Sequence, residues 1–313
     1  MMRSMAGLMV TVTIKTFNCS EGAEGAKKGR MLPCALGSSP SLRAWLALAS
    51  VSFFWGTTYL GIRVALESFP PLLLVCFRFC AAGVLMLAIC RAMGLQMPTR
   101  RGALWSLGHG MLILGVGNMA LTTAELYVAS SLAALIIAAS PFWLVGLESL
   151  MPNGEKLRTP TLVGMVIGLG GVALLMVPGL MEHGLAGNEW KGFLILHVGI
   201  VSWTLGSLIQ KRHDTGADPL VNAAMQQLGA GLLYVIPALV LPQKAVVWDA
   251  KGLGAIAYLI VFGSIVGYSS YIYALTHMPV SLVSVYPYLN VIVAAVLGWL
   301  AYREPFGPKE ITA

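Results

Sequence analysis

The stretch GLGAIAYLIVFGSIVGYSSYIYALTHMPVSLVSVYPYLNVIVAAVLGWLAY, from Gly252 to Tyr302, decides the fold because its 51 residues include no Lys, Arg, Asp or Glu. A helix needs about 20 apolar residues to cross the hydrocarbon core of a bilayer. The stretch is therefore long enough for two spans, and His277-Met278-Pro279 is the expected break between them. A soluble domain with such a run would have an insoluble surface, so we expect the function to lie inside a membrane.

The rest of the chain has the same character. Of its 313 residues 57% are hydrophobic and only 11% are charged, and the mean hydropathy is +0.79. The other uncharged runs are Ala44–Ile62, Gly102–Ala124, Leu126–Leu147, Thr159–Met181, Gly192–Gln210 and Pro219–Gln243, and Phe69–Cys90 is interrupted only by Arg78. A closed barrel would instead show short alternating strands. The sequence predicts an all-α polytopic membrane protein with nine helical spans.

The net charge of +7 is interpreted as a signal of membrane orientation and not of nucleic-acid binding. If the N-terminus is cytoplasmic, the inward loops of the first half carry Arg3, Lys15, Lys27, Lys28, Arg30, Arg43, Arg91, Arg100, Arg101, Lys156 and Arg158. The outer loops of that half carry no Lys or Arg, as the positive-inside rule expects. In the second half the bias is weak and reversed, so the first half orients the chain. Residues 1–42 are polar and are expected to form a disordered cytoplasmic tail, or to precede a later start at Met31.

The chain contains an internal repeat of about 150 residues. At an offset of 148 the matching pairs are Trp55 and Trp203, Arg63 and Lys211, Pro71 and Pro219, and Gly83 and Gly231. Gly117 and Gly267 match at 150, and Glu155 and Glu304 match at 149. One unit would hold five spans, so the second copy would enter the membrane in the opposite orientation. Inverted repeats are typical of alternating-access transporters.

The repeat divides the chain into residues 43–181, with spans 1–5, and residues 190–313, with spans 6–9. A copy of the fifth span, Thr161–Met181, is expected beyond Ala313. The prediction is therefore a C-terminal truncation that lacks the tenth helix, with a genuine nine-span protein and a sequence fragment as alternatives. Span five contains Gly164 and Gly168, a spacing that lets helices approach closely, so self-association through this span is a further expectation.

The stretch Trp55-Gly56-Thr57-Thr58-Tyr59, followed by Pro70-Pro71 and Arg78, closely resembles the opening of EamA-domain proteins of the drug/metabolite transporter superfamily, nearest to the YedA-like permeases. Ser131 to Ile136 with Ser140-Pro141 resembles the fourth helix of that family, and Tyr286 to Gly298 resembles its ninth. The resemblance implies a ten-helix bacterial inner-membrane exporter in which helices 1–4 and 6–9 surround a central cavity. Val291 stands where such proteins usually have a second proline after Pro287, which leaves the kink geometry of span nine open.

Arg78 is the sharpest candidate for contact with a substrate. Counted from Pro71 at 1.5 Å per residue, it lies on the order of 10 Å below the membrane boundary. An arginine there costs roughly 2.5 to 3.5 kcal/mol unless it is paired or hydrated. Its repeat mate is Gln226, so the two halves differ at this depth, which suits an anionic substrate. The alternative is that Arg78 only holds helix ends together, through backbone carbonyls or Glu125.

The other candidates form an aromatic and amide lining. Trp55 and Trp203 occupy equivalent places in the first helix of each copy, and their N–H donors suit amphipathic solutes. The full set of predicted substrate-binding residues is Trp55, Thr58, Tyr59, Arg78, Asn118, Glu125, Trp203, Gln226, Tyr268, Tyr271 and Asn290, with Pro141 and Pro287 as kink or gating positions. Glu125 closes span three and is a candidate for proton coupling. The alternative is that it only caps an exposed helix end. Side chains that only fill a membrane core would look similar.

These residues predict a secondary-active transporter that exports small amphipathic metabolites, amino acids or drugs. No Walker phosphate loop and no zinc-type spacing occurs, so neither a cofactor nor a metal is expected. An inactive remnant is one rival interpretation. An intramembrane enzyme is the other, although Ser264, or Ser202 near His197, offers only chance proximity of a nucleophile and a base.

Overall fold

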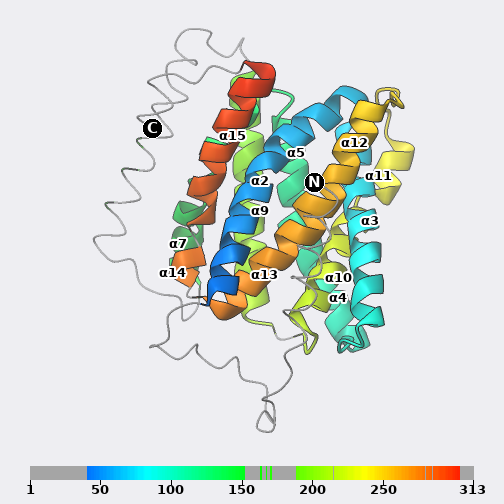
Figure 1. The fold of residues 1–313 in the computed structure, drawn as a ribbon, viewed down its shortest axis with the longest axis vertical. Helices are drawn as coiled ribbons and strands as arrows, with labels where there is room; N and C mark the ends of the chain where they lie inside the picture. Colours follow the sequence, from blue (N-terminus) through cyan, green and yellow to red (C-terminus); the bar gives the residue numbers. More distant parts are fainter. Residues whose placement is uncertain are drawn as a thin grey trace.

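A computed structural model describes residues 41–151 and 188–303, apart from positions 214, 279 and 284, together with positions 163, 167 and 170. Every regular element within these residues is a helix (Figure 1). In this described part of the chain, seven helices are long and apolar enough to cross a membrane: Leu42–Ser68, Pro71–Ala92, Arg100–Ala124, Ser130–Leu150, Glu189–Gln210, Pro219–Val240 and Ala250–Ala274. Large apolar side chains such as Ile236 (72% exposed) and Leu239 (80%) lie on the outer surface. Such a surface suits a lipid environment.

These seven helices coincide with seven of the nine predicted spans. The second half of the charge-free stretch forms α14 (Val280–Val283) and α15 (Tyr286–Tyr302), a shorter apolar helix of 17 residues. The predicted fifth span, Thr161–Met181, and the predicted tail at residues 1–42 lie almost wholly outside the described residues. The count of nine spans therefore stays a prediction.

In the first half of the chain, α2 (Leu42–Ser68) and α3 (Pro71–Ala92) are continuous. The third span consists of α4 (Arg100–Gly110), η1 (Met111–Val116) and α5 (Gly117–Ala124), and the fourth of α6 (Ser130–Ile137) and α7 (Ser140–Leu150). The second half begins with α9 (Glu189–Lys211), followed by α10 (Pro219–Leu232) and α11 (Val235–Val240). The next span consists of α12 (Ala250–Tyr258), η3 (Leu259–Val266) and α13 (Gly267–His277).

The starts of these helices follow ordinary capping chemistry. The side chain of Thr99 accepts a hydrogen bond from the Gly102 amide at the start of α4, over 3.2 Å. Proline occupies the first turn of both α3 and α10, where its missing N–H leaves no bond unmade. These signals explain why the helix boundaries lie close to those that the uncharged runs predict.

Both halves carry a π-helical segment in the middle of their third span. η1 begins at Met111 and η3 at Leu259, 148 residues apart, which is the offset of the sequence repeat. A π segment winds one extra residue into a helical turn and is rare, and it occurs frequently at functional sites. Its presence at matching places in both halves indicates that a functional site lies at this depth of the bundle.

Helices from the two halves pack against each other reciprocally (Figure 1). The first helix of the first half, α2, packs on α12, η3 and α13 and on α15, which are third and fourth helices of the second half. In the same way α9, the first helix of the second half, packs on η1 and α5 and on α6 and α7. The second helices of the two halves, α3 and α10, pack on each other.

The crossing of α3 and α10 is made close by two glycines. A Cβ atom on Gly83 would lie 2.5 Å from the Leu228 nitrogen, and one on Gly231 would lie 2.5 Å from the Cys80 nitrogen. Cys80 and Leu228 are 148 residues apart, as are the two glycines, so both pairs are counterparts in the repeat. The contact of Gly83 with Leu228 in one direction is therefore matched by the contact of Gly231 with Cys80 in the other. Contacts that are exchanged in this way are what a two-fold relation between two units produces.

Candidate functional site

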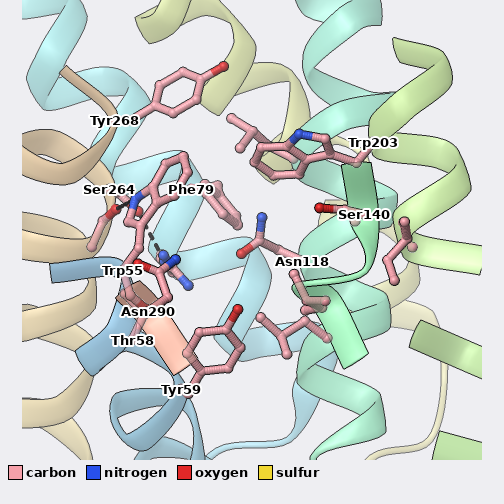
Figure 2. Close-up of a pocket in the computed structure, with 18 of the residues that line it drawn as sticks. Trp55, Thr58, Tyr59, Phe79, Asn118, Ser140, Trp203, Ser264, Tyr268 and Asn290 are labelled. Atoms are coloured by element: carbon pink, nitrogen blue, oxygen red, sulfur yellow. Dashed lines mark hydrogen bonds between the residues drawn. The ribbon is translucent and has the colours of Figure 1, made fainter. Parts of the chain in front are cut away.

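A cavity of about 110 Å³ lies where the helices of both halves meet (Figure 2). Its wall is contributed by α2, α3, α10 and α15, by the interrupted third and fourth spans, and by α9. Eight of the eleven predicted binding residues line it: Trp55, Thr58, Tyr59, Arg78, Asn118, Trp203, Tyr268 and Asn290. The sequence therefore located most of this site, although whether these residues bind a substrate stays a prediction.

Aromatic rings form one side of the cavity. The ring of Trp55 lies edge-on to Trp203, with ring centres 6.1 Å apart, and packs against Tyr271 and Tyr286 at 5.1 Å. Figure 2 shows the polar ends of Tyr59 and Asn118 directed toward the space between these walls. Flat apolar walls with a few polar tips suit a ligand that has an apolar, planar body.

The indole N–H of Trp55 has a structural partner. It donates to the backbone oxygen of Gly263 over 3.0 Å, which ties α2 to η3. We expected this N–H to face a solute, and the structure instead gives it to a carbonyl of the π segment. Gly267 permits the approach, since a Cβ atom there would lie 2.7 Å from the indole nitrogen.

Arg78 is buried in the wall with 5% of its surface exposed. Its Nε donates to the Ser264 hydroxyl over 3.0 Å, and its guanidinium carbon lies 4.9 Å from the centre of the Phe79 ring. The Glu125 carboxylate attracts it electrostatically. Arg78 thus places a positive charge beside the aromatic walls, fixed by η3 from the opposite half of the chain.

The helix-end role considered for Arg78 fits Arg63 instead. A terminal nitrogen of Arg63 donates to the backbone oxygen of Glu125, the residue that caps α5. Arg63 does not line the cavity, whereas Arg78 does. Arg63 and Arg78 therefore have different surroundings, and Arg63 offers a natural control for experiments on Arg78.

Three predicted binding residues, all in the described part of the chain, do not line the cavity. Glu125 is fully buried at the end of α5, Gln226 accepts a hydrogen bond from the Tyr268 hydroxyl, and Tyr271 packs behind Trp55. They support the lining from behind. Their direct contact with a substrate stays a prediction.

Gln227, which was not among the predicted residues, lines the cavity and is fully buried. Its amide nitrogen contacts the Met86 sulfur at 3.3 Å, while its amide oxygen has no hydrogen-bond partner among the described residues. An unpaired carbonyl on a residue that lines a cavity is a candidate acceptor for a ligand N–H or O–H. The repeat offset pairs Arg78 with the adjacent Gln226 and gives no signal for Gln227.

Pro141 and Pro287 lie beside the cavity, each just after a break in a helix. α6 ends at Ile137 and α7 begins at Ser140, while α14 ends at Val283 and α15 begins at Tyr286. Each proline falls in the first turn of the new helix. Ser140 and Tyr286, the first residues of these helices, both line the cavity. The two halves therefore interrupt corresponding spans at this depth, which is a recognised pointer to a transport site.

Known proteins resemble this chain in sequence and in fold. The profile of the EamA-like transporter family matches residues 42–177 and again residues 190–313. The uncharacterized inner membrane transporter YedA of Escherichia coli is 35% identical over 254 residues, which cover 80% of each chain. A chloroplastic WAT1-related protein of Arabidopsis thaliana is 23% identical over 282 residues, covering 88% of this chain and 67% of that protein.

A crystal structure of a protein that is 20% identical in sequence shares the fold. It matches with a TM-score of 0.63 over 88% of this chain and 94% of its own. The charge-free helices, the two segments that match one family profile and the resemblance around Trp55 all agree with these relatives. The chain belongs to the EamA-like transporter family.

Proposed function

We propose that this protein is a secondary-active transporter that moves small amphipathic solutes across a bacterial inner membrane by alternating access, in the direction of export. Metabolites, amino acids and drugs that combine a planar apolar body with an anionic group are the substrates that the cavity suits best. The observation that carries this proposal is Arg78, a buried cation beside aromatic walls where the two halves meet.

The inverted repeat is part of the proposal. Two matches to one family profile and the exchanged glycine contacts of α3 and α10 support two related units. With five spans in each unit and a cytoplasmic N-terminus, the second unit is inverted. Two such halves can expose one central site to either side in turn. The proposal takes residues 43–181 and 190–313 as the two units and the inner membrane as the location, in line with the name of the relative in Escherichia coli.

The energetics of Arg78 favour an anionic ligand. A charged arginine at membrane depth costs roughly 2.5 to 3.5 kcal/mol when it is not compensated. The Ser264 hydroxyl is a neutral partner at the Nε side of the guanidinium, and Glu125, which attracts Arg78 electrostatically, lies outside the cavity lining. The forked edge made by the two terminal nitrogens is the part that pairs with a carboxylate. A carboxylate in the cavity would complete the pairing, while its apolar part would lie against Trp55 and Trp203.

Transport by vesicles that contain the purified protein tests this proposal. Pairs of compounds that share an aromatic body and differ only in having a carboxylate or the matching neutral amide would be screened for accumulation. We expect the carboxylates to be favoured, and we expect the preference to disappear in Arg78→Gln. Arg63→Gln is the matched control, because it removes an arginine from the spans but not from the cavity, and it should keep the preference.

Two results would contradict the proposal. Equal transport of acids and amides by the native protein would exclude an anion-binding role for Arg78. If both arginine variants lose the preference for carboxylates, that preference depends on the fold as a whole and not on the charge in the cavity. A folding check by size-exclusion chromatography and thermal unfolding accompanies each variant.

The relative in Escherichia coli is named as a transporter, which favours this function over an intramembrane enzyme. The chemistry of the described residues agrees. The Ser202 hydroxyl donates to the Leu112 carbonyl, and the His197 ring bonds the Phe193 carbonyl, so each group is engaged with backbone.

A further inference from the structure

His109, in α4, differs from the other three described histidines. The rings of His197, His213 and His277 each bond the backbone oxygen four residues earlier, at 2.8, 3.1 and 2.9 Å. Both ring nitrogens of His109 are buried and have no hydrogen-bond partner among the described residues. A buried polar group without a partner calls for a physical reason, because leaving it unpaired costs about 1 to 3 kcal/mol.

His109 is buried where α4 packs on α9 and α10, with 1% of its surface exposed. The centre of its ring lies 5.8 Å from that of Trp105, one turn earlier in α4. The ring of the exposed His213, which follows α9, is centred 6.1 Å away and stacks on Trp105 at 4.3 Å. The ring is thus enclosed at this junction behind Trp105 and His213, and separation of the helices would expose it to water.

The neighbours of His109 in sequence close the junction. A Cβ atom on Gly229 would collide with the Leu107 backbone, and one on Gly110 would collide with the Gln226 backbone. The Ser106 hydroxyl donates to the Asn222 side-chain oxygen over 2.5 Å. We call this contact of residues 106–110 with residues 222–229 the α4–α10 seal. It adjoins the cavity, because Gln227 of the seal and Leu114, which follows it on η1, both line the cavity.

Among the described residues, few charged and titratable groups lie around the seal. From the segment after α9, His213 is the titratable group beside His109, and the Arg212 guanidinium is directed to the Met151 sulfur. α10 faces α4 with the uncharged residues named above, and its nearest acid is Asp218, at the N-cap, which accepts a hydrogen bond from the Leu220 amide over 2.9 Å. On α4 itself, Arg100 and Arg101 lie exposed at the start of the helix. None of these interactions pairs an acid with His109.

These surroundings exclude an imidazolium from the closed seal. A charge buried without a counter-ion is far more costly than a neutral polar group, so His109 is neutral while α4 and α10 are packed together. Once the seal separates, water can solvate the ring, and an imidazole in water takes up a proton near pH 6.5. Proton binding and opening of the seal must then favour each other, because linkage is reciprocal.

We propose that His109 is the proton-binding site that couples transport to the α4–α10 seal, so that taking up a proton opens the cavity at this end. The inference rests on the proposed function, in which this end faces the cytoplasm. It assigns the coupling role to His109 in place of Glu125, because Glu125 lies at the end of α5 and not at the seal. The ligand of the site is a single proton.

The test measures the opening of the seal and needs no substrate. Spin labels are attached at Arg101 and Ala217, on the two sides of the seal, after the five native cysteines have been replaced by serine. Electron paramagnetic resonance then gives the ratio of separated to packed molecules in lipid nanodiscs. For one histidine that titrates near pH 6.5 only when the seal is open, this ratio should rise about tenfold between about pH 7.5 and 5.5.

Three variants locate the proton. His109→Gln keeps a polar side chain that does not titrate, and it should show no rise; His109→Phe provides a second non-titrating side chain should the first fail to fold. His197→Gln is the matched control, a helical histidine elsewhere in the bundle, and should keep the full rise. His213→Gln should also keep it, because the His213 ring is already exposed.

A ratio that does not change with pH in the native protein would overturn the proposal, as would a rise that persists in His109→Gln. Loss of the rise in His213→Gln but not in His109→Gln would assign the proton to His213 and would also overturn it. Failure of the proposed function would look different. The vesicles would then transport none of the tested solutes, while the seal would still respond to acid through His109.

Discussion

The crossing of α3 and α10 allows a sharp test of the architecture through Gly83→Ala. The added Cβ atom would lie 2.5 Å from the Leu228 nitrogen and 2.8 Å from its Cα, whereas ordinary contact begins at 3.4 Å. These are backbone atoms that cannot rotate away, so the helices would have to separate by about 0.9 Å. Overpacking of this kind costs about 1 to 3 kcal/mol, offset by about 0.5 to 1 kcal/mol that alanine gains over glycine in a helix.

The matched control is Gly254→Ala, on α12, where an added Cβ atom would meet nothing within 4 Å. This variant should be stabilised by the helix preference alone, so the difference between the two variants isolates the collision. The assay is equilibrium unfolding in mixed micelles, which gives the free energy of unfolding of each variant. We expect Gly83→Ala to be less stable than Gly254→Ala by about 1 to 3 kcal/mol.

The reciprocal contact adds a second measurement. Gly231→Ala meets the Cys80 backbone at the same 2.5 Å and should lose a similar free energy. The double variant should lose less than the sum of the two, because helices that one substitution has already separated leave room for the other. If Gly83→Ala proves as stable as Gly254→Ala, the close approach of α3 and α10 is wrong, and the exchanged contacts between the two halves lose their basis.

Three further predictions concern single groups. Trp55→Phe removes the donor to the Gly263 carbonyl and should lower the free energy of unfolding by about 1 to 3 kcal/mol, measured in the same micelle assay. Gln227→Met replaces an amide whose oxygen is unpaired by an apolar side chain of similar length. The variant should raise the free energy of unfolding of the empty protein and weaken solute binding in a filter assay. A lower free energy of unfolding would contradict the inference that the Gln227 oxygen has no partner. Hydrogen bonds from the Gly252 amide and then from the Ser68 hydroxyl lower the pKa of Asp249. The Asp249 carboxylate therefore adds stability that is present above the unfolded pKa near 3.9. This stability is lost as the pH falls through the lower pKa of the folded state. Asp249→Asn keeps the cap without the charge, so its melting temperature should fall less steeply than that of the native protein below about pH 4 and in parallel with it above.

The spans could be predicted because a charged side chain is so costly in a bilayer that a run of about 20 apolar residues without one indicates a membrane helix. The uncharged run from Gly102 to Ala124 lies within the span found at Arg100–Ala124. The cost of an intramembrane arginine likewise singled out Arg78, and the repeat offset paired Trp55 with Trp203, whose rings meet in the cavity. These inferences rest on composition and spacing, which a sequence displays directly.

The remaining features depend on how backbones meet, which spacing does not display. The π segments cannot be found from hydrophobic periodicity, since η1 and η3 are apolar along nearly their whole length. Gln226 and Gln227 lie about 100° apart around the axis of α10, and a repeat offset alone does not show which of them faces the cavity. For the same reason the partner of the Trp55 indole, a carbonyl 208 residues away, could not be foreseen.

The paired π segments also bear on how the gene evolved. At the 148-residue offset from Met111 to Val116, only Gly115 and Gly263 are identical, yet both segments keep the unusual winding. A shared winding with different side chains is what two copies of one ancestral segment would show. The feature common to both segments is thus the path of the main chain at this depth, and not the side chains around it.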